Sequence, residues 1–404
     1  MKSSYFLDRM REQEKWRQED SINLLPSENS ASPQVRALMA SDFGNRYTLP
    51  LNTGSGKAFV ENAYRGTRIS TEVEQAAEEA ACKVYDAGHA CVQPMGGHIA
   101  ALIVIKSTTT RGDSMCSVHV ENGGYDGYAQ PYIPDIYGLK AWHLPFDPER
   151  QNIDTDATAK AIRKRKPTLV ILGASYLLFP YDIGPVREAC DDSGSTLVYD
   201  GSHVMGLIAG GGFQQPLKEG ADVLYGSTHK SFFGPQGGLI VTDRDDLDAA
   251  VRKNLTWRIV DNAHWNRIAA LGQALLEMDR FGKAYAKQVV RNSKRLGKEL
   301  SERGFPIMFE ELGYSESHQL LIDQKRFEKA YDVSINDFSV RMERSNLITD
   351  AVGRLGTCEI TRLGFKEKDL PELADLFMEA AEGRDVRRRV KAMRGRFDMD
   401  YRFR

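Results

Sequence analysis

One lysine stands where a short apolar run gives way to polar side chains. Residues 221–226 read as a buried strand, and Ser227, Thr228 and His229 follow it, with Lys230 directly after them. A lysine presented by the end of a strand, beside hydroxyls and an imidazole, is suited to hold an aldehyde cofactor as a Schiff base. A Thr-His-Lys tripeptide alone is more often part of a surface loop. The interpretation therefore depends on what the rest of the chain supplies.

Two stretches upstream carry the groups that such a cofactor requires. Residues 196–200 read as a second buried strand, which ends in Asp200 and has His203 just beyond it. A carboxylate at the end of a strand can act as the counter-ion of a pyridinium nitrogen. Gly96 and Gly97 stand at the start of an apolar helix, where free backbone N–H groups can bind a phosphate. Phosphate site, acid and lysine follow one another in that order.

Strand and helix patterns alternate from about residue 90 to residue 242. This alternation predicts a mainly parallel α/β sheet with its site at the carboxyl ends of the strands. Residues 71–88 are predicted as a helix, with a capping box of Thr71 and Glu74 at its start and Gly88 at its end. Residues 168–173 read as a buried strand that ends near Ser175.

Length and composition suggest more than one compact unit. The 404 residues are expected to form a helical arm over residues 1–20, a large α/β domain over 21–258 and a smaller α+β domain over 259–404 with a basic tail. The basic run 384–391 is expected to be a solvated helix, because no aromatic platform for nucleic acid accompanies it.

Bulk properties exclude several classes of protein. The chain has 54 basic and 56 acidic residues and a formal net charge of −2, which gives no sign of binding to nucleic acid or to an anionic membrane. No apolar run approaches the ~18 residues of a membrane span, and residues 1–6 lack a signal-peptide core, so a cytoplasmic protein is expected. The five cysteines are scattered without a Cys-x-x-Cys pair, which favours reduced thiols and no metal site.

Four separated motifs resemble the serine hydroxymethyltransferase family of pyridoxal-phosphate (PLP) enzymes, which have the aspartate-aminotransferase fold. They are Asn-Leu-Leu-Pro-Ser-Glu-Asn at 23–29, Tyr-Asp-Gly-Ser-His at 199–203, Ser-Thr-His-Lys at 227–230 and Gly-Thr-Cys-Glu-Ile-Thr-Arg-Leu-Gly-Phe at 356–365. The similarity runs through nearly the whole chain, and Gly-Pro-Gln-Gly at 234–237 is similar to the archaeal branch. The resemblance implies fold type I, with a large mainly parallel α/β domain and a smaller α+β C-terminal domain.

The resemblance also implies roles around PLP. Lys230 carries the cofactor, Asp200 keeps the pyridine nitrogen protonated, and Ser175 and His203 contact the phenolic oxygen. The residues expected to bind the cofactor are Gly96, Gly97, His98, Tyr125, Ser175, Asp200, His203, Ser227, His229 and Lys230.

Further residues are implied for the amino-acid substrate. Arg362 is expected to bind the α-carboxylate, since a planar bidentate donor suits that group, and Ser27 is expected to assist. By resemblance Tyr64 lies over the substrate, and Tyr47 reaches the cofactor phosphate of the neighbouring subunit. A buried core tyrosine is the alternative for both. The expected catalytic residues are Lys230, Asp200, His203, His229 and Tyr64, and the shared sites imply a homodimer or tetramer.

The chain departs from the family at several positions. The family's catalytic glutamate falls at Leu49, which an inserted stretch follows, and Glu61 is the candidate replacement. His98 replaces a serine for the phosphate, and Tyr125 replaces an imidazole that stacks on the cofactor ring. Residues 259–265 replace a glycine-rich loop that reaches across the dimer.

The expected activity is the interconversion of serine and glycine by a PLP enzyme with a tetrahydropterin carrier, either tetrahydrofolate or a methanopterin relative. Loss of the glutamate at position 49 favours an alternative, a carrier-independent aldolase or transaldolase acting on threonine-like or α-methylated β-hydroxy amino acids. An aminotransferase is a further alternative. A binding or regulatory protein without turnover is disfavoured by the intact Asp200, Lys230 and Arg362.

Overall fold

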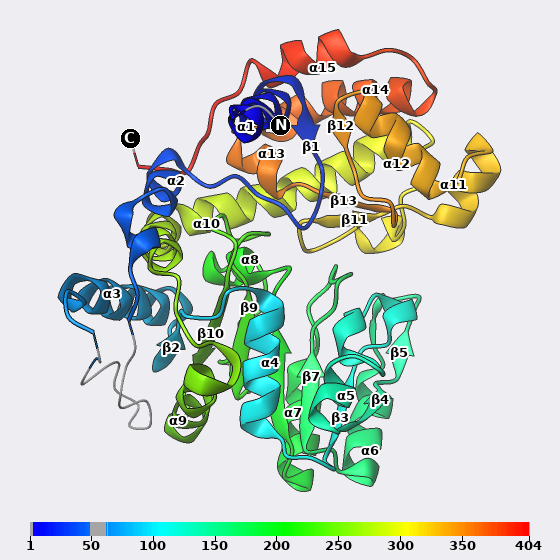
Figure 1. The fold of residues 1–404 in the computed structure, drawn as a ribbon. Coiled ribbons are helices and arrows are strands. Elements are labelled where there is room, and N and C mark those ends of the chain that lie inside the picture. Colours follow the sequence, from blue (N-terminus) through cyan, green and yellow to red (C-terminus); the bar gives the residue numbers. More distant parts are fainter. Residues whose placement is uncertain (1–2, 49–61, 63, 404) are drawn as a thin grey trace. The chain divides into compact units, whose positions relative to one another are not determined.

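The computed structural model describes residues 3–48, 62 and 64–403 (Figure 1). These residues form two compact units, one of Met1–Glu28 with Lys287–Arg402 and a larger one of Asn29–Ala286 with Phe403–Arg404. The expected domain boundaries at residues 20 and 258 fall elsewhere. Two elements explain the difference: β1 (Ile22–Asn23) pairs with β12 (Leu347–Ile348), and the helix α10 (Trp265–Glu302) continues without a break past residue 286.

The larger unit is built on a seven-stranded sheet with the strand order β2-β10-β9-β8-β7-β3-β4. All strands from β9 to β4 pair in parallel, whereas β10 runs antiparallel to both β9 and β2. The predicted mainly parallel α/β sheet is thus confirmed. The strands are β2 (His89–Cys91), β3 (Ser114–Ser117), β4 (Lys140–His143), β7 (Leu169–Leu172), β8 (Thr196–Asp200), β9 (Val223–Ser227) and β10 (Gly238–Thr242).

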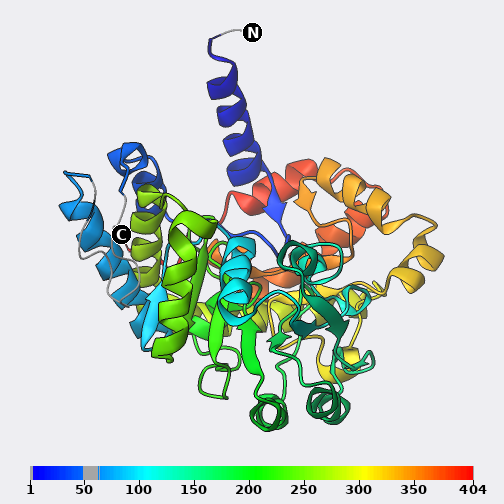
Figure 2. The same ribbon diagram turned by 60° about the horizontal axis from the view of Figure 1, so that its bottom comes forward.

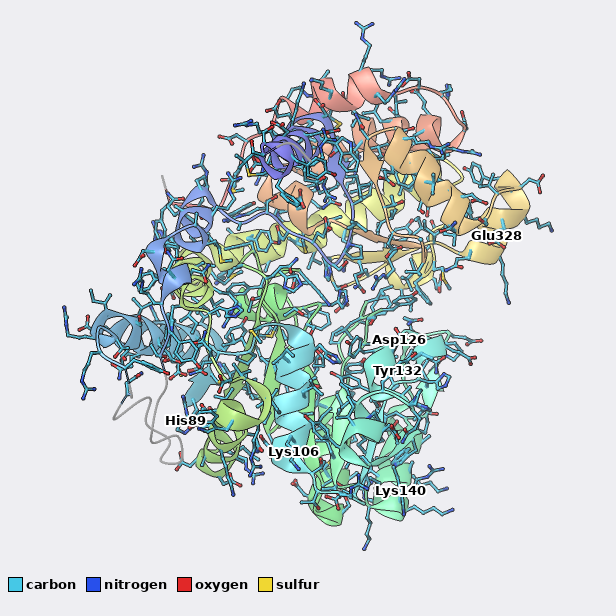
Figure 3. All side chains as sticks on the ribbon, in the orientation of Figure 1. His89, Lys106, Asp126, Tyr132, Lys140 and Glu328 are labelled. Carbon is cyan, nitrogen blue, oxygen red and sulfur yellow. The ribbon has the colours of Figure 1, made fainter. Side chains whose placement is uncertain are left out.

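Helices cover the sheet and leave its central strands fully buried. Every residue of β7 is inaccessible to solvent, as expected for a parallel strand that is covered on both faces. The helices α4 and α9 pack together over β9 and β10, and His89 on the edge strand β2 contacts Asp245 of α9 at 2.7 Å (Figure 3). The remaining elements of this unit are α2 (Pro33–Met39), α3 (Arg68–Tyr85), α4 (Gly97–Thr108), α5 (Ile133–Tyr137), β5 (Phe146–Asp147), β6 (Asn152–Ile153), α6 (Thr155–Arg165), α7 (Ile183–Ser193), α8 (Met205–Ala209) and α9 (Asp245–Asn254).

Helix α3 begins four residues earlier than the capping pattern predicts. Thr67 is its N-cap residue, and the hydroxyl of Thr71 donates to the carbonyl oxygen of Thr67 at 3.1 Å. Glu74 is fully buried and accepts a hydrogen bond from Gln93 at 2.7 Å. The predicted capping box of Thr71 and Glu74 is therefore wrong. The helix ends at Tyr85, and its C-cap residue Asp86 takes the left-handed conformation, so the helix ends before the predicted Gly88.

The smaller unit is an α+β assembly around an aromatic core. Besides the pair β1–β12, the strands β11 (Gln319–Leu321) and β13 (Arg354–Gly356) pair antiparallel. Phe305 lies at the centre of the core, with its ring 5.1 Å from that of Phe377. The helices are α1 (Tyr5–Lys15), α11 (Gln324–Tyr331), α12 (Ile335–Arg344), α13 (Cys358–Arg362), α14 (Leu370–Ala381) and α15 (Arg387–Arg394).

The two charged helices of this unit differ in how they are held. Helix α1 has no buried residue and stands out from the rest of its unit (Figure 2). Helix α15, which contains most of the basic run, buries Val390 and Met393 and pairs Lys391 with Asp20 at 2.6 Å. No helix among the described residues is long and apolar enough to cross a membrane, and these residues contain no cluster of His, Cys, Asp and Glu that could hold a metal ion.

Gly173 at the end of β7 is expected to be indispensable for stability. Its φ is +137°, and a Cβ there would lie 2.4 Å from the carbonyl oxygen of Asp200. Gly173→Ala should lower the free energy of unfolding by at least about 2 kcal/mol, measured by urea denaturation.

Gly184→Ala is the matched control. Gly184 lies on the exposed start of α7, and the nearest atom to its Cβ position is 3.9 Å away. This variant should be as stable as the wild type or more stable by up to about 1 kcal/mol. Equal stability of the two variants would contradict the steric argument.

Candidate active site

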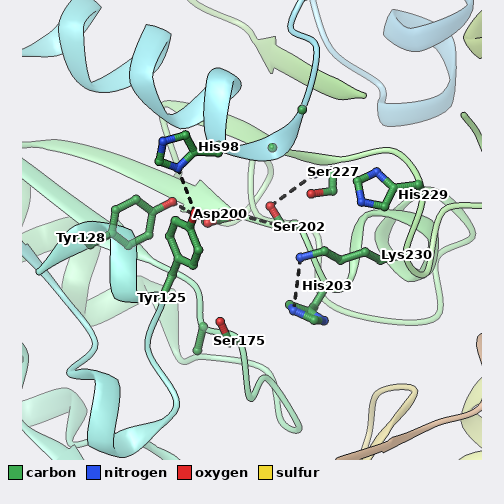
Figure 4. Close-up of a pocket in the computed structure, with 13 residues that line it drawn as sticks. His98, Tyr125, Tyr128, Ser175, Asp200, Ser202, His203, Ser227, His229 and Lys230 are labelled. Carbon is green, nitrogen blue, oxygen red and sulfur yellow. Dashed lines mark hydrogen bonds between the residues drawn. The ribbon is translucent and has the colours of Figure 1, made fainter. Parts of the chain in front are cut away.

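A pocket of about 280 Å³ opens in the larger unit where β7, β8 and β9 end and α4 begins (Figure 4). All ten residues expected to bind the cofactor line it, and so do three that the sequence did not single out: Tyr128, Ala174 and Ser202. The carboxyl ends of parallel strands meet at one edge of a sheet. Segments more than a hundred residues apart in the sequence therefore contribute to one pocket.

The start of α4 forms a cradle of backbone N–H groups at one end of the pocket. Gly96 is the N-cap residue, and Gly97 opens a helix of 12 residues whose first N–H groups have no partner within the helix. A Cβ on Gly97 would lie 2.3 Å from the hydroxyl oxygen of Ser227. The backbone approaches β9 closely, and the N–H groups and helix dipole at this helix start can bind an anion the size of a phosphate.

Buried polar contacts hold the loop, residues 92–95, that precedes this cradle. Gly238 donates its backbone N–H to the carbonyl oxygen of Pro94 at 2.8 Å. Gln93 donates to Glu74 at 2.7 Å, and the guanidinium of Arg267 donates to the carbonyl oxygen of Val92 at 2.5 Å. Burial raises the pKa of Glu74 well above its ordinary value. The cradle thus rests on side chains that are themselves removed from water.

Asp200 ends β8 and lies at the pocket with both carboxylate oxygens engaged. Its Oδ1 accepts the backbone N–H of Ser202 at 2.9 Å, and its Oδ2 accepts the hydroxyl of Tyr128 at 2.5 Å. The hydroxyl of Tyr225 lies 2.7 Å from that of Tyr128. The sequence gave no sign of Tyr128 as a partner. Tyr225 could have been noticed, because its hydroxyl interrupts the apolar run that precedes Ser227.

Lys230 follows β9 on a segment that is pinned along its backbone. Its Nζ lies 3.3 Å from Nε2 of His203. The side-chain amide of Asn29 donates to the carbonyl oxygen of Lys230 at 2.8 Å, and the hydroxyl of Thr228 donates to the carbonyl oxygen of Pro235 at 2.7 Å. The amine is therefore presented to the pocket by a fixed backbone. His229 lines the pocket beside it.

Tyr125 and His98 lie together at the pocket. Nδ1 of His98 is 2.8 Å from the hydroxyl of Tyr125, and the two rings meet edge to face. Burial, together with the nearby charge of Asp200, raises the pKa of Tyr125 above its ordinary value. Tyr125 therefore offers a neutral aromatic face, and the imidazole of His98 is held by its hydroxyl.

The residues expected to bind substrate lie outside this pocket's described lining. Tyr47 and Tyr64, with 42% and 46% of their surfaces exposed, make an edge-to-face pair with ring centroids 5.2 Å apart. Tyr47 also donates to Asp261 at 3.0 Å. The alternative of buried core tyrosines is thus wrong for both. Positions 49 and 61 lie outside the described residues.

Ser27 and Arg362 belong to the smaller unit. Ser27 is half-buried in a turn. Arg362 ends α13 and is fully buried, so the alternative of a surface arginine is wrong. Its Nη1 donates to the carbonyl oxygen of Tyr401, and its own carbonyl oxygen accepts the N–H of Asp400 at 2.8 Å.

The polar groups around the pocket fit PLP. The N-terminus of α4 suits its phosphate, Asp200 suits its pyridine nitrogen, and Lys230 suits its aldehyde carbon. A model of the serine hydroxymethyltransferase family matches residues 5–377.

The chain belongs to the serine hydroxymethyltransferase family. It is 39% identical over 397 residues to the serine hydroxymethyltransferase of Methanothermobacter marburgensis, with 95% of this chain and 91% of the relative covered. It is also 39% identical over 406 residues to that of Methanocaldococcus jannaschii, covering 96% and 92%. Both organisms are archaea. The expected family and its archaeal-like branch are confirmed.

A solved structure extends the comparison to the fold. L-threonine transaldolase from Pseudomonas fluorescens is similar with a TM-score of 0.87 and 25% identity, covering 99% of this chain and 93% of that one. Together with the family match, this similarity confirms the fold of PLP enzymes of type I that the resemblance implied.

Gly97→Ala should weaken PLP binding by tenfold or more, about 1.4 kcal/mol. The added methyl would press on Ser227 and displace the cradle. The measurement is titration of the apoprotein with PLP, followed by absorbance.

Gly184→Ala is the control. Gly184 lies outside the pocket, on the exposed start of α7, and the nearest atom to its Cβ position is 3.9 Å away. PLP affinity close to that of the wild type is expected. Equal losses in both variants would show that the close approach of Gly97 does not shape the phosphate site.

Proposed function

We propose that this chain is a PLP-dependent serine hydroxymethyltransferase that interconverts serine and glycine with a tetrahydropterin as one-carbon carrier. The observation that carries the proposal is the convergence of Gly97, Asp200 and Lys230 on one pocket, within a chain that belongs to this family. Bound PLP supplies an electron sink for the electrons left at the Cα of an amino acid when its Cα–Cβ bond breaks.

The residues of the larger unit bind and orient the cofactor in this proposal. The N–H groups at the start of α4 bind the phosphate, and Lys230 supplies the amine that links the cofactor to the chain. Asp200 keeps a proton at the pyridine nitrogen. Tyr125 offers the face for stacking, and Ser175 and His203 are directed to the phenolic oxygen.

Proton movement is proposed for the histidines beside Lys230. His203 lies within hydrogen-bond distance of the lysine Nζ, at 3.3 Å, so its ring can hold a proton against that amine or accept one from it. His229 lies next to Lys230 in the chain and lines the same pocket. The pair can therefore serve the exchange in which the substrate amine displaces the lysine.

Substrate binding is proposed for residues that the family motifs identify. Arg362 binds the α-carboxylate with help from Ser27 and Tyr64, and a bidentate guanidinium fixes the orientation of the substrate as well as its charge. The exposure of Tyr47 and Tyr64 is compatible with roles toward a substrate or a second subunit. We propose a homodimer with shared sites, in which Tyr47 reaches the cofactor phosphate of the partner.

A carrier-independent transaldolase is the second candidate. The similarity to L-threonine transaldolase favours it, as does the absence of a glutamate at position 49. The two reactions share the cleavage of a Cα–Cβ bond and differ in what receives the fragment. Tetrahydrofolate and a methanopterin relative are both proposed as carriers for the first.

Purified protein should yield a covalent PLP adduct on Lys230 after reduction with borohydride. The reagent converts the reversible link between lysine and aldehyde into a stable amine, and peptide mapping then locates it. The control is Lys230→Ala, in which no adduct should form at another lysine. An adduct on a different lysine in the wild type would refute the proposed site.

Serine cleavage should depend on a reduced pterin. Transfer of the one-carbon unit needs an acid or base to move protons, and Glu61 is the proposed group. Glycine formation from serine is measured with and without each carrier. It should fall by about 100-fold or more when the carrier is omitted, and by a similar factor in Glu61→Gln with the carrier present.

Glu79→Gln, which removes an exposed carboxylate on α3, is the matched control and should retain full activity. Cleavage of threonine-like substrates should survive in Glu61→Gln, because release of an aldehyde needs no carrier. Equal cleavage of serine with and without pterins, unchanged in Glu61→Gln, would replace the proposal by the transaldolase.

A further inference from the structure

A chain of hydrogen bonds leads from the core of the larger unit to the carboxylate of Asp200. The hydroxyl of Tyr128 lies 2.5 Å from Oδ2 of Asp200 (Figure 4). The hydroxyl of Tyr225, on β9, lies 2.7 Å from the hydroxyl of Tyr128. Tyr225 is 0% and Tyr128 1% exposed. Two phenols that are hidden from water thus form a chain that ends on Asp200, the one carboxylate among the described residues that line the pocket.

The direction of this chain follows from its protons. An ionised carboxylate can only accept hydrogen bonds, so Tyr128 donates to Asp200. A phenol has a single proton, and Tyr225 must therefore donate to Tyr128. Burial and the nearby charge of Asp200 raise the pKa of both phenols well above their ordinary value. Both donors consequently remain protonated at neutral pH.

Asp200 still has lone pairs that can accept a hydrogen bond from a further donor. Oδ1 accepts the N–H of Ser202, and Oδ2 accepts Tyr128. A carboxylate offers about four acceptor positions, so a pyridinium N–H can still bind. In a buried pair of this kind, the proton can lie on the nitrogen or on the carboxylate. Hydrogen bonds donated to the carboxylate favour its charged form and therefore keep the proton on the nitrogen.

We propose that Tyr128, supported by Tyr225, is a positioning residue that keeps Asp200 ionised and directed at the pyridine nitrogen of bound PLP. This inference rests on the proposed function, because it requires PLP in this pocket. The role is separate from packing, because the aromatic ring can be kept while the hydroxyl is removed. In this proposal Tyr128 acts through Asp200.

The test uses the holoenzyme of Tyr128→Phe reconstituted with PLP labelled with ¹⁵N in its ring. The ¹⁵N resonance should move toward that of an unprotonated pyridine, and the dissociation constant for PLP should rise about tenfold. The kcat for serine cleavage should fall by about tenfold, with KM for serine changed less than twofold. Tyr225→Phe should shift the resonance in the same direction by a smaller amount.

Tyr199→Phe provides a matched control. Tyr199 precedes Asp200 on β8, so its side chain points to the opposite face of the sheet. It is 0% exposed, and its hydroxyl donates to Gln214 at 2.9 Å. This variant loses an equally buried phenolic donor and should leave the ¹⁵N resonance at the position of the wild type.

An unchanged resonance in Tyr128→Phe, or an equal change in Tyr199→Phe, would overturn the inference. If Tyr128→Phe does not fold, Tyr225→Phe decides, because its loss weakens the same donor and leaves the contact with Asp200 in place. A wild-type protein that binds no PLP would overturn both the proposed function and this inference. If the pyridine nitrogen is protonated in the wild type and stays protonated in Tyr128→Phe and Tyr225→Phe, only this inference is overturned.

Discussion

Close approach of backbone segments at the strand ends is the constraint on which the pocket depends. Gly97 brings the start of α4 against Ser227, and Gly173 brings the end of β7 against Asp200, each at a distance that leaves no space for a Cβ atom. Protein interiors tolerate few voids and little overlap, so these two contacts set the spacing between α4 and the three central strands. That spacing determines how far apart the cradle, the carboxylate of Asp200 and Lys230 lie.

Hydrogen bonds within the protein fix two of the polar groups of the pocket. Asp200 is held by Ser202 and Tyr128, and the backbone at Lys230 is held by Asn29. Such groups reorganise little when a charged ligand arrives, which is the physical basis of electrostatic preorganisation. The same scaffold is compatible with more than one acceptor for the fragment that leaves Cα, as the likeness to a transaldolase illustrates.

The sequence predicted those parts of the pocket that lie where a strand ends or a helix begins. Two glycines before an apolar run, and apolar runs that stop at Asp200 and before Ser227, suffice to place helix start and strand ends, and all ten expected cofactor residues line one pocket. Contacts between distant segments could not be read in this way. Tyr128 looks like any core tyrosine until its hydroxyl is seen beside Asp200, and Glu74 matched a helix cap although tertiary packing buries it.

Because Glu74 is buried, its carboxyl group binds a proton more tightly in the folded chain than in the unfolded chain. Full burial, with the charge of Glu78 nearby, raises its pKa well above the ordinary range, against the opposing effect of Gln93. The folded protein therefore keeps a proton here that the unfolded chain releases above its own pKa, near 4.3. The corresponding stability is complete below that pH and is lost as pH rises through the raised value. Because Glu74 accepts a hydrogen bond from Gln93, a rise of pH through this raised pKa acts on the loop that leads to the phosphate cradle.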